Sequence, residues 1–362
     1  MLTYLSAGES HNKGYFAIIS GFVPGFYIDI ENINEILRLR QIPYGRSSRQ
    51  KIEQDNIEIL SGVIQGKTIG SNITFFIKNN DYQKDLDDID YYRPGHPDRG
   101  ASAKYGFKNM RLVAEPTSAR NTVIRCAIGA LAKQFLETFD IRSYSYTLSI
   151  GQTIFDDSNF MKNPQTKLIY RSPVFCPDKT ISDRMVKEID KAKANNDSIG
   201  GTYRILIKNV PPGLGDYNRY YTKLDARLSS AVMSVQGCKS VEIGKGFTLS
   251  KMYGSIAADR IILKQGKIIS ENNYSGGIDG GLSNGDDIII KGMMKPIPMI
   301  KQSLQSISTT TKEPIVTKYE RSDTCAVPSA ALIAEMAVNW EILVAFMEKF
   351  DGKSLNEIKS NL

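Results

Sequence analysis

Cysteine is scarce in this chain, and the few cysteines lie far apart. The 362 residues contain Cys126, Cys176, Cys238 and Cys325, and none of them belongs to a CxxC pair. Zinc and redox sites need closely spaced cysteines, and disulfide frameworks are dense in small secreted domains. We therefore expect no metal site and no disulfide framework, and the spacing favours reduced thiols in the core or lining a site.

The chain also lacks a membrane-like run and a secretory leader. No stretch approaches the roughly 18 uncharged apolar residues of a bilayer span, and the start MLTYLSAGES has no basic region followed by an apolar core. Hydrophobic residues make up 41% and charged residues 23%, which is typical of soluble globular proteins. We expect a cytoplasmic protein without a membrane partner.

Positive charge exceeds negative charge by seven, yet the chain has no long arginine run and no basic stripe. A basic excess serves either nucleic acids or small phosphorylated ligands. The arginines instead recur one or two at a time in segments that contain Gly, Ser or Pro, and these are Arg46, Arg49, Arg93, Arg99, Arg120 and Arg321. Without aromatic residues between them, this pattern favours a focused anionic pocket and argues against a nucleic-acid partner.

Histidine occurs only twice, which makes both imidazoles informative. His11 ends the string GESH at residues 8–11, just after a mostly apolar run, and His96 lies in RPGHPDR at residues 93–99. Imidazole titrates nearest to neutral pH and is the usual proton shuttle. His11 is therefore a candidate acid or base, whereas His96, taken alone between two prolines, is more typical of a solvated loop.

Hydrophobic periodicity predicts a mixture of strands and helices. Strands are expected at 15–20, 57–63, 72–77, 141–154 and 202–208, and helices at 30–40, 117–137, 181–194, 224–235 and from Pro328 through Phe346. A helix followed by IEILSG (57–62) and TIGSNI (68–73) is echoed by a helix followed by VEIGKG (241–246) and SNGDDI (283–288). The echo suggests an internal duplication, although its two gaps differ in length.

Two segments have the chemistry to hold an anion. The stretch PYGRSSRQK at 43–51 has three cations and two serines, and it is either a solvated loop or a mobile phosphate-binding loop. The helix at 117–137 is expected to start after Pro116 with Thr117 or Ser118 as its cap, so that its N-terminus and Arg120 favour an anion. Near the C-terminus, Arg321 and Asp323 project to one side of an extended segment, as an ordinary salt bridge would.

Taken together and in order, these segments resemble the chorismate synthase family. The strings that carry the resemblance are GESH (8–11), SAR (118–120), RSDTCAVP (321–328) and IAE (333–335). Supporting strings are YGR (44–46), EILSG (58–62), RPGH (93–96), KLDARL (223–228), NG (284–285) and MKPI (294–297). Each string is short, but their shared order spans residues 8–335 and covers nearly the whole chain.

The resemblance implies a fold and a reaction. The implied fold is a single α+β domain over residues 1–362, a β-α-β sandwich of antiparallel sheets and helices with internal duplication, assembled as a homotetramer. The implied reaction converts 5-enolpyruvylshikimate 3-phosphate to chorismate by an anti-1,4-elimination of phosphate and a C6 proton. This is the last step of the shikimate pathway in aromatic amino acid biosynthesis. The family requires reduced FMN, which supplies an electron transiently and later takes the proton through N5, and some members use NADPH as the flavin reductant.

The resemblance also implies roles for particular residues. His11 is expected to protonate the leaving phosphate, His96 to protonate the reduced flavin, and Asp323 to assist proton removal by way of N5. Residues expected to hold a phosphate, of the substrate or of NADPH, are Ser10, Arg40, Arg46, Arg49 and Arg120. Expected flavin contacts are Pro116, Thr117, Ser118, Gln236, Gly237, Gly280, Lys295, Pro296, Ile297, Pro298, Met299 and Arg321.

Three positions depart from the family pattern. Asn12 stands where the family usually has Gly, Pro116 where it has Arg, and Asn121 where it has Glu. These changes motivate a second hypothesis, a repurposed paralogue that keeps the flavin pocket as a binding or regulatory module. All three proposed proton-handling residues remain, which favours the active enzyme.

Overall fold

The computed structural model describes residues 1–47, 54–264, 266–318 and 322–361. The strands are β1 (Thr3–Ala7), β2 (Gly14–Ser20), β3 (Ile57–Ser61), β4 (Val63–Ile64), β5 (Lys67–Thr68), β6 (Ile73–Lys78), β7 (Arg142–Ile150), β8 (Thr153–Ile154), β9 (Gly201–Lys208), β10 (Cys238–Ile243), β11 (Ile261–Lys264), β12 (Lys267–Ser270), β13 (Ile278–Asp279), β14 (Leu282–Ser283), β15 (Ile288–Met294), β16 (Gln305–Ile307) and β17 (Pro314–Val316). The α-helices are α1 (Ile30–Gln41), α2 (Asp98–Tyr105), α3 (Arg111–Thr117), α4 (Thr122–Glu137), α5 (Thr166–Arg171), α6 (Lys179–Ala194), α7 (Leu224–Met233), α8 (Gly254–Ala257), α9 (Val327–Lys349) and α10 (Leu355–Ser360). Short 3-10 turns are η2 (Ala119–Asn121), η3 (Phe160–Lys162) and η4 (Gly246–Lys251).

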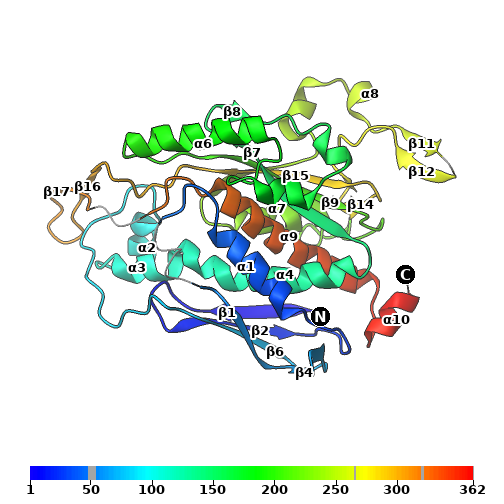
Figure 1. The fold of residues 1–362 in the computed structure, drawn as a ribbon, viewed down its shortest axis with the longest axis horizontal. Coiled ribbons are helices and arrows are strands. Elements are labelled where there is room, and N and C mark those ends of the chain that lie inside the picture. Colours follow the sequence, from blue (N-terminus) through cyan, green and yellow to red (C-terminus); the bar gives the residue numbers. More distant parts are fainter. Residues whose placement is uncertain (48–53, 265, 319–321, 362) are drawn as a thin grey trace.

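Two antiparallel sheets enclose a layer of helices. The first sheet has the strand order β1-β2-β6-β3, and the second has the order β10-β15-β9-β7-β8. Helices α1, α4, α7 and α9 lie between them, and α6 lies on the outer side of the second sheet (Figure 1). The predicted α+β sandwich of antiparallel sheets and helices is confirmed.

The strand order repeats in the two halves of the chain. The first half runs β1, β2, α1, β3, β6, α4, and the second runs β7, β9, α7, β10, β15, α9. In each half the fourth of these strands inserts between the second and the third, which gives the orders 1-2-6-3 and 7-9-15-10. The predicted duplication is therefore visible in the topology, and the gaps differ because η4, α8 and the β11–β12 hairpin are inserted between β10 and β15.

Helices α4 and α9 form the centre of the core. The apolar side chains predicted on one side of the first helix are buried in α4, and α9 contacts β7, β9, β15 and helices α1, α4 and α7. Helix α9 is long and apolar enough to cross a membrane by length and composition, but 89% of its most hydrophobic window is buried inside the protein. It is therefore the core helix of this fold.

The start of α4 differs from the sequence-based prediction. Pro116 and Thr117 belong to α3, and α4 begins only at Thr122. A proline lacks the amide proton that a regular helix needs for its hydrogen bonds. Helix α3 ends at Thr117, and the next residue, Ser118, has an extended backbone. The Ser118 hydroxyl accepts a 3.3 Å hydrogen bond from the Arg120 amide and so caps the short turn η2, not α4 itself.

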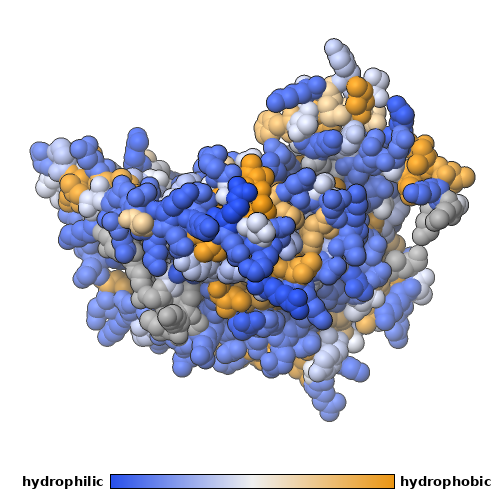
Figure 2. Space-filling view, turned by 45° about the horizontal axis from the view of Figure 1, so that its top comes forward, coloured by the Kyte–Doolittle hydropathy of each residue, from blue (hydrophilic) through white to orange (hydrophobic). Residues whose placement is uncertain are grey.

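Most of the surface in Figure 2 is hydrophilic, and the hairpin of β11 and β12 projects from it with several exposed apolar side chains. Ile261, Leu263 and Ile268 are each more than 70% exposed. The four cysteines are buried free thiols, as the spacing in the sequence predicted.

The crossing of α4 and α9 depends on Gly129. A Cβ atom at this position would collide with the backbone carbonyl of Met336. Overpacking against a backbone costs about 1–3 kcal/mol, and the helix propensity gained by alanine, about 1 kcal/mol, offsets only part of it. We expect Gly129→Ala to lower the free energy of unfolding by about 1–2 kcal/mol in denaturant titration.

Gly100→Ala in α2 is the matched control, because no atom lies within 4 Å of a Cβ built there. This variant should be neutral or gain up to about 1 kcal/mol. Equal stability of the two variants would contradict the close approach of α4 and α9.

Candidate functional site

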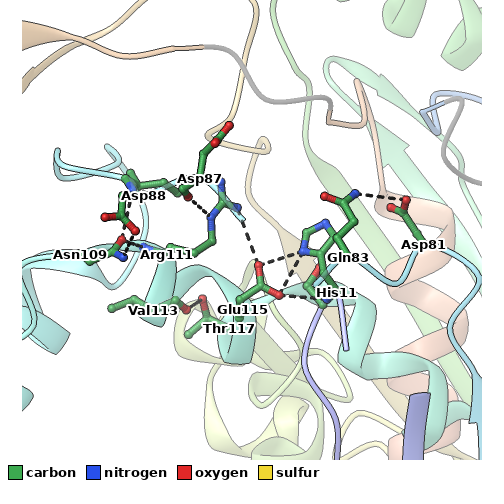
Figure 3. Close-up of polar contacts among 12 residues, drawn as sticks. His11, Asp81, Gln83, Asp87, Asp88, Asn109, Arg111, Val113, Glu115 and Thr117 are labelled. Atoms are coloured by element: carbon green, nitrogen blue, oxygen red, sulfur yellow. Dashed lines mark hydrogen bonds and ion pairs between the residues drawn. The ribbon is translucent and has the colours of Figure 1, made fainter. Parts of the chain in front are cut away.

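His11 is held by a carboxylate that lies far away in the sequence. Its ring Nδ1 is 2.9 Å from Oε1 and 3.1 Å from Oε2 of Glu115, and its backbone amide donates a 2.9 Å hydrogen bond to Oε2. Figure 3 shows the ring facing Glu115 on α3, with Arg111 on the other side of the carboxylate. The His11 and Glu115 side chains are 17% and 15% exposed, so the pair is partly buried.

The two partners are fixed by separate parts of the fold. The turn between β1 and β2 carries His11, and Asn79 Nδ2 donates to the carbonyls of Ser10 and Asn12 on that turn, at 3.0 and 2.7 Å. Helix α3 is anchored by a small separate core of Ile89, Tyr91, Met110, Val113 and Ala114. The Ser10 amide donates to the Glu115 carbonyl at 3.2 Å, which connects the two parts.

The Glu115 carboxylate is held in its ionised form. Partial burial acts to raise its pKa, but hydrogen bonds from the His11 ring and amide and the charges of His11 and Arg111 outweigh burial. The net effect lowers the pKa of Glu115 below its usual value of 4.5. Sequence reasoning missed this residue, although it directly precedes the predicted flavin contacts Pro116, Thr117 and Ser118.

His96 lies in a loop that a buried ion pair holds in place. Asp98 accepts hydrogen bonds from the backbone amide, Nε and Nη2 of Arg93 at 2.7–2.9 Å, and the Asp98 side chain is fully buried. The ring Nδ1 of His96 lies 3.0 Å from the Pro94 carbonyl. Burial and the charges of Arg93 and Lys295 lower the pKa of His96 below 6.5. His96 is therefore a half-buried residue in a loop that the Arg93–Asp98 ion pair holds in place.

The structure brings the His96 loop against residues 295–299, which the resemblance assigned to the flavin. Lys295 Nζ donates to the Gly95 carbonyl at 2.7 Å, and the Lys295 amide donates to the Gly237 carbonyl at 2.9 Å. Ser322 donates its hydroxyl proton to the Met299 carbonyl. A small cleft between the two loops is lined by Tyr91, Arg93, Pro94, His96, Pro298, Met299, Ile300, Gln302, Leu304 and Thr317. Three of the predicted segments are thus neighbours, namely the His96 loop, Gly237 and residues 295–299.

Asp323 joins the two ends of the chain. Its carboxylate pairs with Arg46 Nη1 at 2.8 Å and accepts a 2.6 Å hydrogen bond from the Ser47 amide. Gly45 allows this approach with a φ of 95°, and its carbonyl accepts from the amides of Thr324 and Cys325. The expected partner Arg321 lies outside the described residues, as does Arg49.

Two other predicted phosphate-binding residues share a buried carboxylate. Asp55 accepts from Arg40 Nη2 at 2.9 Å and from both Nη atoms of Arg120 at 2.5 and 3.1 Å. Arg40 and Arg120 are only 2% and 6% exposed. Their guanidinium groups are thus fixed near the start of α4, and sequence reasoning missed Asp55 because nothing local marks it.

Gly280 lies apart from the other predicted residues. It is in the turn between β13 and β14, a hairpin that packs near Gly215 and Leu224. Figure 1 places β14 at the opposite end of the molecule from α2 and α3. Gln236, by contrast, precedes Gly237 next to residues 295–299, and its side-chain Oε1 is buried without a hydrogen-bond partner among the described residues.

Comparison with known proteins gives the family. Residues 2–347 match the sequence profile of the family described as chorismate synthase. This chain belongs to the chorismate synthase family. It is 44% identical to the chorismate synthase of Alkaliphilus oremlandii (strain OhILAs), covering 100% of this chain and 97% of the relative. It is 38% identical to that of Carboxydothermus hydrogenoformans (strain ATCC BAA-161 / DSM 6008 / Z-2901), again covering 100% and 97%.

A solved structure agrees with these relatives. A crystal structure of chorismate synthase superposes with a TM-score of 0.83 at 33% identity, covering 99% of this chain and 96% of that one. The chain is accordingly a lyase of the shikimate pathway that acts on a small phosphorylated substrate. Chorismate synthases are soluble enzymes, which agrees with α9 as a core helix.

The departures from the chorismate synthase pattern are accommodated by local hydrogen bonds. Asn12 Nδ2 donates to Glu9 Oε2 at 2.6 Å, and Asn121 Nδ2 donates to the Pro116 carbonyl at 2.7 Å. Neither contact involves the His11 ring or the Glu115 carboxylate. The substitutions therefore leave the His11–Glu115 pair intact.

The Arg93–Asp98 pair should carry the stability of the His96 loop. Removing one partner of a buried pair leaves an uncompensated charge and costs about 3–5 kcal/mol. We expect Asp98→Ala to lower the free energy of unfolding by about that amount in denaturant titration. Asp183→Ala is the control, because Asp183 and Lys179 on α6 form a pair that is 58% and 88% exposed and worth about 1 kcal/mol or less. Similar losses for both variants would contradict the role of Asp98.

The lowered pKa of Glu115 predicts an acid-dependent loss of stability. A carboxyl whose pKa is lower in the folded state stabilises the fold above its unfolded pKa and loses that contribution as the pH falls through the folded value. We expect the thermal midpoint of the wild type to exceed that of Glu115→Gln at pH 7, with the difference shrinking as the pH falls below 4.5. A difference that stays constant from pH 7 to pH 3 would contradict an ionised Glu115.

Proposed function

We propose that this chain converts 5-enolpyruvylshikimate 3-phosphate to chorismate by an anti-1,4-elimination of phosphate and a C6 proton. The observation that carries the proposal is the sheltered His11 ring, which two atoms of Glu115 hold beside the predicted substrate and flavin segments. A departing phosphate gathers negative charge, and a positioned imidazolium that gives it a proton lowers the barrier. His11 is the proposed proton donor.

The other two proton-handling residues are His96 and Asp323. The Nδ1 atom of His96 faces the Pro94 carbonyl at 3.0 Å, so its Nε2 is the atom that remains to carry a proton in the cleft. The Asp323 carboxylate, which contacts Arg46 and the Ser47 amide, is proposed to assist removal of the C6 proton. Ser322 connects this carboxylate to residues 295–299, next to the His96 loop.

The residues present fit reduced FMN. The buried Oε1 of Gln236 lacks a hydrogen-bond partner among the described residues, as an acceptor reserved for a ligand would. Gly237 with a φ of 85°, Lys295 and the loop through Met299 would hold the cofactor, together with Pro116, Thr117 and Ser118. When bound in its reduced form, the flavin would supply a transient electron and a nitrogen that can take up a proton. Arg321 and Gly280 stay predicted contacts.

Phosphate recognition is assigned to Ser10, Arg40, Arg46, Arg49 and Arg120. The ion pairs with Asp55 and Asp323 hold Arg40, Arg46 and Arg120 in fixed positions. Less side-chain entropy is then lost when these residues bind a phosphate. The same cations are the proposed site for NADPH as a flavin reductant. We further propose a cytoplasmic homotetramer in which residues 1–362 form one domain.

The test is chorismate formation from 5-enolpyruvylshikimate 3-phosphate with FMN under reducing, anaerobic conditions. General acid catalysis is worth about 10²–10⁴-fold, so we expect His11→Ala and His96→Ala each to lower kcat at least about 100-fold while the circular dichroism spectrum shows that the fold is retained. Arg142→Ala, in an exposed surface pair, is the control and should keep full activity.

The paralogue hypothesis predicts a different result. A repurposed protein would bind FMN, measured by fluorescence quenching, without forming chorismate. That outcome would replace the enzyme with a binding or regulatory module.

A further inference from the structure

Glu115 contacts His11 at two points at once. Both carboxylate oxygens lie within 3.1 Å of the ring Nδ1, and Oε2 also accepts the His11 backbone amide at 2.9 Å. A side chain that grips both the backbone and the ring fixes the position of the residue and the rotation of its imidazole. The contact spans 104 residues of sequence, so it is built by the tertiary fold.

Arg111 lies on the side of the Glu115 carboxylate that faces away from His11 (Figure 3). Arg111 Nη1 lies 3.8 Å from Oε1 one helical turn earlier on α3, and Arg111 Nε donates to the Asp87 carbonyl at 2.9 Å (Figure 3). Glu115 also accepts the Ser10 amide with its backbone carbonyl. Helix α3, the loop before it and the turn that carries His11 thus form one connected hydrogen-bond network.

We propose that Glu115 is a positioning residue that fixes the tautomer of His11 and presents its Nε2 to the departing phosphate. An ionised carboxylate only accepts hydrogen bonds, so the proton at this contact belongs to Nδ1 of the ring. The Nε2 atom is then the one that gives and regains a proton. This inference rests on the proposed function, in which His11 is the proton donor.

The proton balance of the step follows from this arrangement. The imidazolium carries protons on both nitrogens and gives the Nε2 proton to the oxygen that leaves carbon with the phosphate. The ring becomes neutral and keeps Nδ1–H, which Glu115 continues to accept. The opposite neutral tautomer would place a lone pair against the carboxylate and is disfavoured. Glu115 therefore selects the tautomer to which Nε2 can be reprotonated from water.

The test reads the tautomer directly and does not require turnover. Protein labelled with ¹⁵N in histidine shows the ring nitrogens of only two residues, and a His11→Ala sample assigns them. In the wild type we expect neutral His11 to be protonated at Nδ1. In Glu115→Gln the side-chain amide can donate as well as accept, so we expect the His11 ring signals to move toward the Nε2–H tautomer.

Two internal controls accompany this measurement. His96 should keep its signals, because its Nδ1 faces the Pro94 carbonyl and not Glu115. Glu341→Gln should leave His11 unchanged, because Glu341 pairs with Arg227 between α9 and α7. This variant makes the same carboxylate-to-amide change in a partly buried ion pair away from His11.

Activity gives the second readout. An amide in place of an orienting carboxylate stabilises the wrong tautomer, so Glu115→Gln should lower kcat at least about tenfold, with KM changed less than about threefold. Glu115→Asp keeps the charge one methylene further away and should recover part of the loss. Glu341→Gln should keep the wild-type kcat.

Two results would overturn the proposal. Unchanged His11 ring signals in Glu115→Gln would show that the carboxylate does not set the tautomer, whether or not the protein makes chorismate. A shifted tautomer with undiminished kcat would show that the tautomer does not matter for catalysis. Absence of chorismate formation in the wild type would refute the proposed function instead, and the ring signals would still decide what Glu115 does to His11.

Discussion

The close packing of helix α4 against α9 is the constraint on which the rest of the structure depends. Each of these helices is the last element of one of the two duplicated halves. The lack of a side chain at Gly129 allows the backbones of α4 and α9 to come close together. The sheets lie on either side of this layer, so the position of every connecting loop follows from it (Figure 1). A site assembled from loops can be sheltered and precise only because this central layer is rigid.

Among the described residues, carboxylates hold several of the proposed chemical groups, most of them from distant segments and one, Asp98, from within the same loop. His11 is held by Glu115, the His96 loop by Asp98, Arg46 by Asp323, and Arg40 and Arg120 by Asp55. Because these arginines are paired with aspartates, they contribute little to the net positive charge of the chain. Such pairs fix the orientation of the guanidinium groups, which is the basis on which a phosphate-binding role is proposed for them.

Much of the fold was predictable from local patterns. Apolar periodicity located α1, α4, α7 and α9 and the strands β2, β3, β6, β7 and β9 to within a few residues, whereas β1, β10 and β15 were not predicted as strands. The echo of IEILSG in VEIGKG indicated the duplication that the strand order displays. The prediction was wrong at 117–121, because α3 ends at Thr117, Ser118 is extended and the turn η2 precedes α4. Propensity alone does not distinguish one long helix from two joined by a capped turn.

The sequence by itself determined which residues are the candidates for catalysis, because histidine is rare here and its strings follow the order of the chorismate synthase family. Only the tertiary structure decided what holds those residues. Asp98 pairs with Arg93 inside one loop, but Glu115 and Asp55 are two among 39 acidic residues and carry no local mark. Their roles come from contacts such as the one between residues 11 and 115, which exist only when the two segments are brought together by folding around α4 and α9.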